Sequence, residues 1–189
     1  MRRTIALVLV FCSGFAVMVL EIVGARFLAK DFGSSFYVWV SQIGVILTAL
    51  ALGYGFGGLL ADRNERAPIL TWPLVGVGLF TAFIPEFAPK LIELLILRHP
   101  TDRDIPVLWQ KLDPALGSAA VFLLPCFVLA MLPPYMIRRA AKHLTQVGRI
   151  SGLVYAASTV GSIAGVFVSG YILIDYMNLS NIFRVTGAL

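Results

Sequence analysis

The chain has 189 residues, of which 59% are hydrophobic and only 13% are charged, and its mean hydropathy is +0.88. Ordinary soluble domains carry about 25% charged residues, so this composition excludes a water-soluble core and indicates a membrane protein. The charged residues behind the net charge of +5 cluster between apolar runs. That is the pattern of membrane loops, and it excludes a nucleic-acid-binding face.

Apolar runs of membrane-spanning length follow one another along the chain. A spanning helix needs about 20 mainly apolar residues, and this predicts spans over residues 4–29, 36–61, 67–84, 115–137 and 150–174. A sixth run begins near Leu179 and is too short to cross by Leu189, so we expect the native chain to continue. The predicted fold is an all-α, polytopic bundle with six spans, the last incomplete, or with seven.

The first run is predicted to be a retained membrane helix and not a signal peptide, because it extends to Ala29, beyond the about 7–15 residues of a signal-peptide core. Basic residues then set the orientation, since loops rich in Lys and Arg stay in the cytoplasm. They predict a cytoplasmic N-terminus, with these residues on the inner side: Arg2, Arg3, Arg63, Arg66, Arg138, Arg139, Lys142 and Arg149.

The long connection 85–114 is predicted to lie outside the cytoplasm. Leucines and Ile96 alternate there with Lys90, Glu93 and Arg98, which indicates an amphipathic helix in the membrane interface. Trp109 is a second candidate interfacial anchor. The alternative is that this segment lengthens the third span at a tilt.

Two ridges of small residues recur at four-residue spacing, which places each ridge on one helix face and permits close backbone approach. Their members are Ala49, Gly53, Gly57 and Ala61 in the second span, and Ala157, Gly161, Gly165 and Ser169 in the fifth. Each ridge lies in the middle helix of a group of three. This predicts a 3+3 inverted repeat, with residues 1–84 and 115–189 as its halves in one transmembrane domain. We expect the ridges to bind another copy or another membrane subunit, alongside the lipid bilayer.

Chemistry-bearing residues are few. Glu21 lies about 25 Å and Arg26 about 33 Å along the first helix from Thr4. A carboxylate at the depth of Glu21 is costly unless it is protonated or paired, and Arg184 is a candidate partner. Glu21, Arg26 and Arg184 are therefore candidate residues for a solute or proton site; the alternative is a structural bond between helices.

No metal site, disulfide or cofactor is predicted. Cys12 and Cys126 both lie in the middle of apolar runs, His99 and His143 lie in polar connections, and no CxxC motif occurs. Buried packing is the simpler role for such cysteines.

The segment Gly58-Leu-Leu-Ala-Asp62-Arg63-Asn-Glu-Arg66 resembles the loop signature of the major facilitator superfamily, G-x-L-A-D-R-x-G-R. Glu65 stands where that signature has glycine. The resemblance implies a cytoplasmic loop in which arginines bridge to carboxylates; the alternative is a charged stop-transfer loop.

A wider resemblance covers nearly the whole chain except the long connection. Ser13-Gly-Phe-Ala-x4-Glu21-Ile-x3-Arg26-Phe-Leu, Phe32-Gly-Ser-Ser35 and Gly152-Leu-Val-Tyr155-Ala-Ala-Ser158-Thr159-x-Gly161 are similar to the membrane module of bacterial membrane-bound, spermidine-synthase-like proteins. The resemblance implies half of a facilitator-type fold in the bacterial cytoplasmic (inner) membrane. It also implies an aminopropyltransferase-like domain after the helices. The glycine-rich nucleotide loop and acidic pair of that domain are not found in this sequence, so no catalytic residue is assigned and enzyme activity stays undecided.

The sequence thus favours a membrane module that binds or moves a small solute, such as a polyamine-like cation, near Glu21. Two alternatives stay open. One is a structural or anchoring subunit of a larger membrane complex, and the other is the membrane anchor of an aminopropyltransferase whose catalytic domain lies outside this chain.

Overall fold

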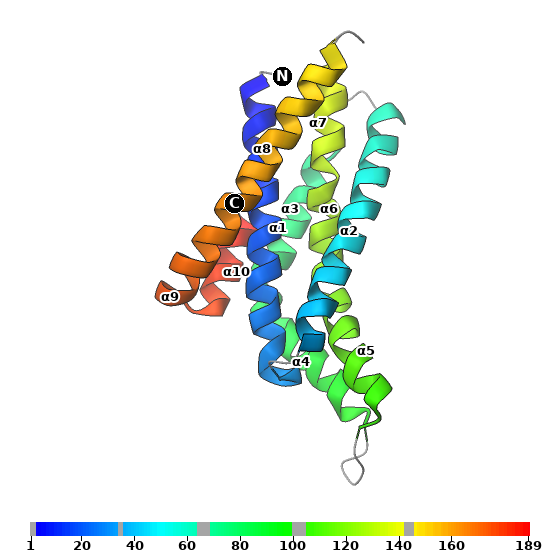
Figure 1. Cartoon of the computed structure of the whole chain (residues 1–189), viewed down its shortest axis with the longest axis vertical. Coiled ribbons are helices and arrows are strands. Elements are labelled where there is room, and N and C mark those ends of the chain that lie inside the picture. Colours follow the sequence, from blue (N-terminus) through cyan, green and yellow to red (C-terminus); the bar gives the residue numbers. More distant parts are fainter. Residues whose placement is uncertain (1–2, 34–35, 64–68, 100–104, 142–145) are drawn as a thin grey trace.

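The computed structural model describes residues 3–33, 36–63, 69–99, 105–141 and 146–189, and every regular element in these ranges is a helix (Figure 1). In chain order the helices are α1 (Arg3–Phe32), α2 (Phe36–Arg63), α3 (Thr71–Ala82), α4 (Ile84–Leu97), α5 (Val107–Ser118), the π-helical segment η1 (Ala119–Leu123), α6 (Leu124–Ala130), α7 (Leu132–Ala140), α8 (Val147–Val168), the π-helical segment η3 (Ser169–Leu173), α9 (Ile174–Tyr176) and α10 (Leu179–Ala188). The all-α prediction is therefore confirmed.

Four helices in the described ranges are long and apolar enough to cross a membrane: Thr4–Phe32, Phe36–Arg63, Val107–Ala140 and Val147–Tyr176. The prediction of six spans is not confirmed. The run expected over 67–84 forms α3, which has 12 residues and is about 18 Å long at 1.5 Å per residue. That is short of a hydrocarbon core of about 30 Å.

The connection 85–114 is more helical than expected. α4 covers most of its first half, and the next span begins at Val107 instead of residue 115. Ile84, Ala88 and Ile92 form the buried face of α4, while Lys90 and Glu93 are exposed. One face of α4 is thus buried in the bundle, while the amphipathic helix in a membrane interface stays a prediction.

The third span stays helical across prolines that interrupt its hydrogen bonds. Pro133 has no N–H group, so the carbonyl oxygen of Leu129, four residues earlier, loses its helical donor. The Ser13 hydroxyl of α1 donates to that oxygen at 2.8 Å. A side chain from a neighbouring helix therefore donates to the carbonyl that loses its regular donor at proline, in addition to a backbone N–H at the end of α6.

The first ridge of small residues packs against the third span. A Cβ atom at Gly53 would lie 2.4 Å from the carbonyl oxygen of Phe127, and one at Gly57 would lie 2.6 Å from that of Met131. Ala49 and Ala61 are buried on the same side of α2. Only a glycine permits the two backbones to approach so closely.

The second ridge packs against α1. A Cβ atom at Gly161 would lie 2.1 Å from the Phe11 carbonyl oxygen, and one at Gly165 would lie 2.6 Å from that of Phe15. Ser169 is buried, and Ala157 is partly buried. Both ridges are thus covered by helices of the same chain. The ridge glycines are therefore occupied within the chain, and binding of another copy or subunit stays a prediction.

The two short helices α3 and α10 cross at a pair of glycines. A Cβ atom at Gly78 would lie 2.6 Å from the Gly187 carbonyl oxygen, and one at Gly187 would lie 2.4 Å from that of Gly78. Figure 1 shows α10 beside α1, and the N-terminus, the end of α2, the end of α7 and the start of α8 at one end of the bundle. This grouping agrees with the predicted loops, although which end faces the cytoplasm stays a prediction.

Candidate functional site

Glu21 lies in the lower half of α1 and is half-buried. Its carboxyl group lies near the fully buried Cys126 thiol of α6. Within the described residues, no ion pair or hydrogen bond joins Glu21 to another group. This carboxyl is therefore an intramembrane acid without a protein counter-ion in the part of the chain that the structure describes.

The residues expected to accompany Glu21 lie elsewhere. Arg26 is exposed on α1, five residues on and rotated by about 140° on the helix. Arg184 of α10 donates to Glu86 of α4 at 2.6 Å. The expected pairing of Glu21 with Arg184 is therefore wrong, because Arg184 pairs with Glu86 instead.

Hydroxyl groups lie on the side of α1 that carries Glu21. Gly14 precedes Glu21 by two helical turns and lies on the same face. Its carbonyl oxygen accepts a hydrogen bond from Ser162 of α8 at 3.3 Å. A small cavity of about 40 Å³ adjoins Gly14, and Tyr54 of α2 and Ser158 of α8 also line it. α2 and α8 thus bring polar groups together over the same face of α1.

A second buried polar group lies between α1, α2 and α5. The amide nitrogen of Gln42 donates to the Leu20 carbonyl oxygen at 3.2 Å, and its amide oxygen accepts from Ser118 at 2.6 Å. Gln42 and Ser118 are fully buried, so this pair fixes the three helices beside Glu21. The sequence interpretation missed Gln42, although it lies on the same stripe as Ile46, Ala49 and Gly53.

The loop motif lies at the end of α2. Asp62 accepts a hydrogen bond at 3.1 Å from Arg138 of α7, and both side chains are exposed. A cavity of about 500 Å³ adjoins this ion pair and is lined by Gly58. Arg63 is exposed, and Arg66 lies outside the described residues. The predicted bridge between an arginine and a carboxylate is thus present, with Arg138 as the arginine.

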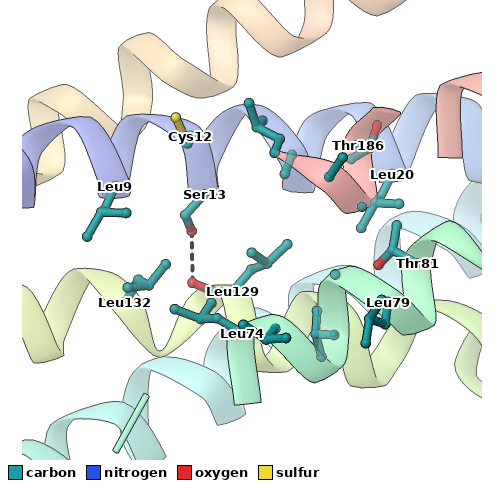
Figure 2. A pocket seen from close by; sticks show the side chains of 17 residues that line it. Leu9, Cys12, Ser13, Leu20, Leu74, Leu79, Thr81, Leu129, Leu132 and Thr186 are labelled. Atoms are coloured by element: carbon teal, nitrogen blue, oxygen red, sulfur yellow. Dashed lines mark hydrogen bonds between the residues drawn. The ribbon is translucent and has the colours of Figure 1, made fainter. Parts of the chain in front are cut away.

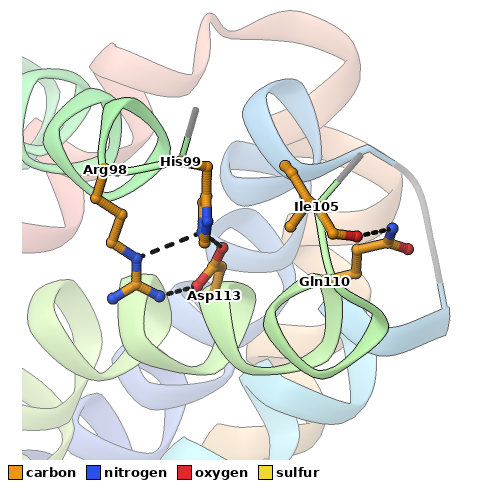
Figure 3. Close-up of polar contacts among 5 residues, drawn as sticks. All are labelled: Arg98, His99, Ile105, Gln110 and Asp113. Atoms are coloured by element: carbon orange, nitrogen blue, oxygen red, sulfur yellow. Dashed lines mark hydrogen bonds and ion pairs between the residues drawn. The ribbon is translucent and has the colours of Figure 1, made fainter. Parts of the chain in front are cut away.

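A charged cluster joins α4 to α5 at the opposite end of the bundle (Figure 3). Asp113 is 4% exposed and pairs with Arg98 through Oδ1. Its Oδ2 lies 2.7 Å from Nε2 of His99. The Arg98 guanidinium lies 4.2 Å from the centre of the Trp109 ring. Because every charge in this cluster meets an opposite one, it is best described as a clamp between two helices.

A larger apolar cavity of about 360 Å³ lies between α1, α3, the third span and α10 (Figure 2). Ser13, Thr81 and Thr186 contribute its hydroxyl groups, and no charged side chain lines it. Within the described residues, no group of three or more side chains suitable for a metal ion occurs.

Comparison with known proteins decides no identity. No protein-family model matches this chain, and no curated protein and no solved structure gives a match. The resemblance to spermidine-synthase-like membrane modules therefore stays a prediction.

Proposed function

We propose that this chain is a membrane-embedded module that binds a small cation at Glu21. The observation that carries the proposal is the half-buried Glu21 carboxyl group, for which the described residues supply no counter-ion. A carboxyl group in a membrane span must be protonated, paired with a protein cation, or bound to a cation from outside.

The surroundings of Glu21 fit a proton or an amine better than an anion. Arg26 is the nearest basic residue on α1, and its exposed position on another helix face keeps its guanidinium available to the interface. The hydroxyls of Tyr54, Ser158 and Ser162 lie further along the same side of α1. Such groups offer hydrogen-bond acceptors to an ammonium group. The polyamine-like character of the solute follows from the family resemblance alone.

The proposal includes a 3+3 inverted repeat of half-facilitator type, and a constant register between α1 and the third span supports it. The hydrogen bond from Ser13 reaches Leu129, 116 residues later. The same separation relates Phe11 to Phe127 and Phe15 to Met131. In each case a small residue of the middle helix packs on the carbonyl oxygen: Gly161 and Gly165 on α1, and Gly53 and Gly57 on the third span.

One contact joins positions that are equivalent under this register, Ser13 with Leu129. Gly78 and Gly187 also meet across the two halves, at a separation of 109 residues. A two-fold axis that exchanges the repeats would pass through the first of these contacts. α1 and the third span run in opposite directions in Figure 1, as an inverted repeat requires. Location in a bacterial cytoplasmic membrane with a cytoplasmic N-terminus completes the proposal and derives from the loops and the resemblance.

Binding of spermidine to purified protein tests the function. The Glu21→Gln variant keeps the size of the side chain and removes the charge, so spermidine affinity should fall roughly tenfold or more. Glu93→Gln on the exposed face of α4 is the matched control and should bind like the wild type. Equal affinity in the Glu21→Gln variant would remove Glu21 from the function.

A structural or anchoring subunit is the second candidate. The close packing of both glycine ridges inside the chain favours it, since tight helix contacts give a rigid anchor without a solute path. Absence of saturable binding of spermidine, putrescine and protons by the wild type would favour this reading. The membrane anchor of an aminopropyltransferase is one form of this second candidate. A catalytic domain in the native reading frame would establish it.

A further inference from the structure

The apolar cavity between α1, α3, the third span and α10 contains a polar group that the fold does not use. The Thr81 side chain is 2% exposed and lines the cavity. Its hydroxyl has no hydrogen-bond partner among the described residues. Figure 2 shows Thr81 projecting from α3 toward α1 and α10.

Three other helical threonines of this chain behave differently. Thr48, Thr159 and Thr186 donate to the carbonyl oxygen four residues earlier, at 2.8, 2.9 and 2.8 Å. That local bond is the usual way to satisfy a hydroxyl group inside a membrane helix. Thr81 does not form it, although leaving a buried hydroxyl unpaired costs about 1–3 kcal/mol. A hydroxyl of this kind indicates a missing hydrogen-bonding group in the cavity.

The cavity has the size and lining of a ligand site. Its volume of about 360 Å³ lies within the range of roughly 300–1,000 Å³ found for small-molecule pockets. Thr81 and Thr186 lie toward one end, and Leu9 and Leu132 toward the other (Figure 2). The Ser13 hydroxyl is already committed to Leu129. A polar head therefore fits beside Thr81, and an apolar chain fits toward Leu9 and Leu132.

Two features identify the occupant. No charged side chain lines the cavity, and a charged head would lack compensation there, so the head is uncharged. Leu9, Val75 and Leu79 line the cavity and are 37%, 51% and 58% exposed. They lie on apolar helices whose outer faces meet lipid chains in a bilayer, so the cavity communicates with the hydrocarbon.

We propose that this cavity binds one uncharged, single-chain amphiphile from the bilayer, with its polar head hydrogen-bonded to Thr81. The proposal does not depend on Glu21, which does not line the cavity. The site belongs to the interface between the two halves of the chain, since α1 and α3 come from the first half and the third span and α10 from the second.

Photolabelling in phosphatidylcholine nanodiscs tests the proposal with diazirine-bearing dodecanol as the probe. The expected result is saturable labelling, displaced by unlabelled dodecanol, in peptides that contain Leu9–Leu20 and Leu74–Thr81. Thr81→Val preserves the shape of the side chain and removes the hydroxyl, so the affinity should fall roughly fivefold. Unchanged affinity in this variant would overturn the role of Thr81.

A second variant fills the cavity. Ala16 is 5% exposed and lines it, so Ala16→Leu should abolish saturable labelling. Ala156 of α8 is exposed and does not line it, so Ala156→Leu is the control and should label like the wild type. Labelling that is not saturable, or that persists in Ala16→Leu, would contradict the proposal. If Ala16→Leu does not fold, the Thr81→Val result decides.

Discussion

The Ser13 hydroxyl donates to the carbonyl oxygen of Leu129 at 2.8 Å, and that oxygen is the one from which Pro133 withholds a helical donor. The bond crosses from α1 to α6 and repairs the third span where proline interrupts it. It also joins α1 to the third span at a buried position, since Ser13 is 4% exposed.

Removal of this hydroxyl should destabilise the protein more when Pro133 is present than when it is replaced. Ser13→Ala should cost about 1 kcal/mol, because the hydrogen bond that joins α1 to the Leu129 carbonyl oxygen is lost. In a Pro133→Ala background the helix regains its own N–H donor, and Ser13→Ala should then cost less. Thermal unfolding of the wild type, the two single variants and the double variant in detergent measures this coupling. Equal costs in both backgrounds would contradict the assigned role.

Close packing of the glycine ridges gives a second prediction. Gly161→Ala places a Cβ atom against the Phe11 carbonyl oxygen, so it should destabilise the fold by about 1–3 kcal/mol. Gly152→Ala lies in the same helix with no atom within 4 Å of its Cβ position. This control should be neutral or slightly stabilising, since alanine favours helix over glycine. Similar unfolding temperatures for both variants would show that the α1–α8 contact is looser than described.

The sequence predicts the helices and the positions of close helix contacts, but it does not predict which helices pair. The length of the apolar runs predicted the helices, and four-residue spacing predicted that Gly53 and Gly161 lie in close contacts. The partner of each ridge could not be predicted, because a small-residue stripe fits a helix of its own chain as well as a helix of another. Pairing of Arg184 with Glu86 likewise depends on how α10 packs on α3 and α4, which no local pattern specifies.

Some residues of the candidate site could be predicted from the sequence, and others could not. Glu21 was found because a carboxyl group is rare in an apolar run, whereas Thr81 was missed because a threonine in such a run normally bonds to its own helix. Nothing in the sequence around Asp113 indicates that this side chain is buried. Its burial results from the packing of α4 against α5, and only the folded chain reveals it.

The clamp between α4 and α5 gives a third prediction. Asp113→Asn removes the negative charge that both Arg98 and His99 meet. Loss of one partner from a buried ion pair leaves the other uncompensated, so unfolding should become easier by about 3 kcal/mol. Asp175→Asn, at an exposed position near the end of the fourth span, is the matched control and should change stability by less than about 0.5 kcal/mol. Comparable losses of stability in Asp113→Asn and Asp175→Asn would show that the clamp does not stabilise the fold.

Cysteine reactivity gives a fourth prediction. Cys126 is fully buried, whereas Cys12 is partly exposed and lines the apolar cavity. An apolar maleimide dye should therefore label Cys12 in the folded protein and reach Cys126 only on unfolding. Mass spectrometry of the labelled peptides reads out both sites. Rapid labelling of Cys126 in folded protein would show that the core around Glu21 is open.

Binding of a cation by the Glu21 carboxyl group can be measured at that group itself. Difference infrared spectroscopy of the protein in lipid, recorded on addition of spermidine, measures carboxyl groups directly. We expect a change in carboxyl and carboxylate bands that is present in the wild type and in Glu93→Gln and absent in Glu21→Gln. An identical difference spectrum in Glu21→Gln would contradict binding of the cation by Glu21.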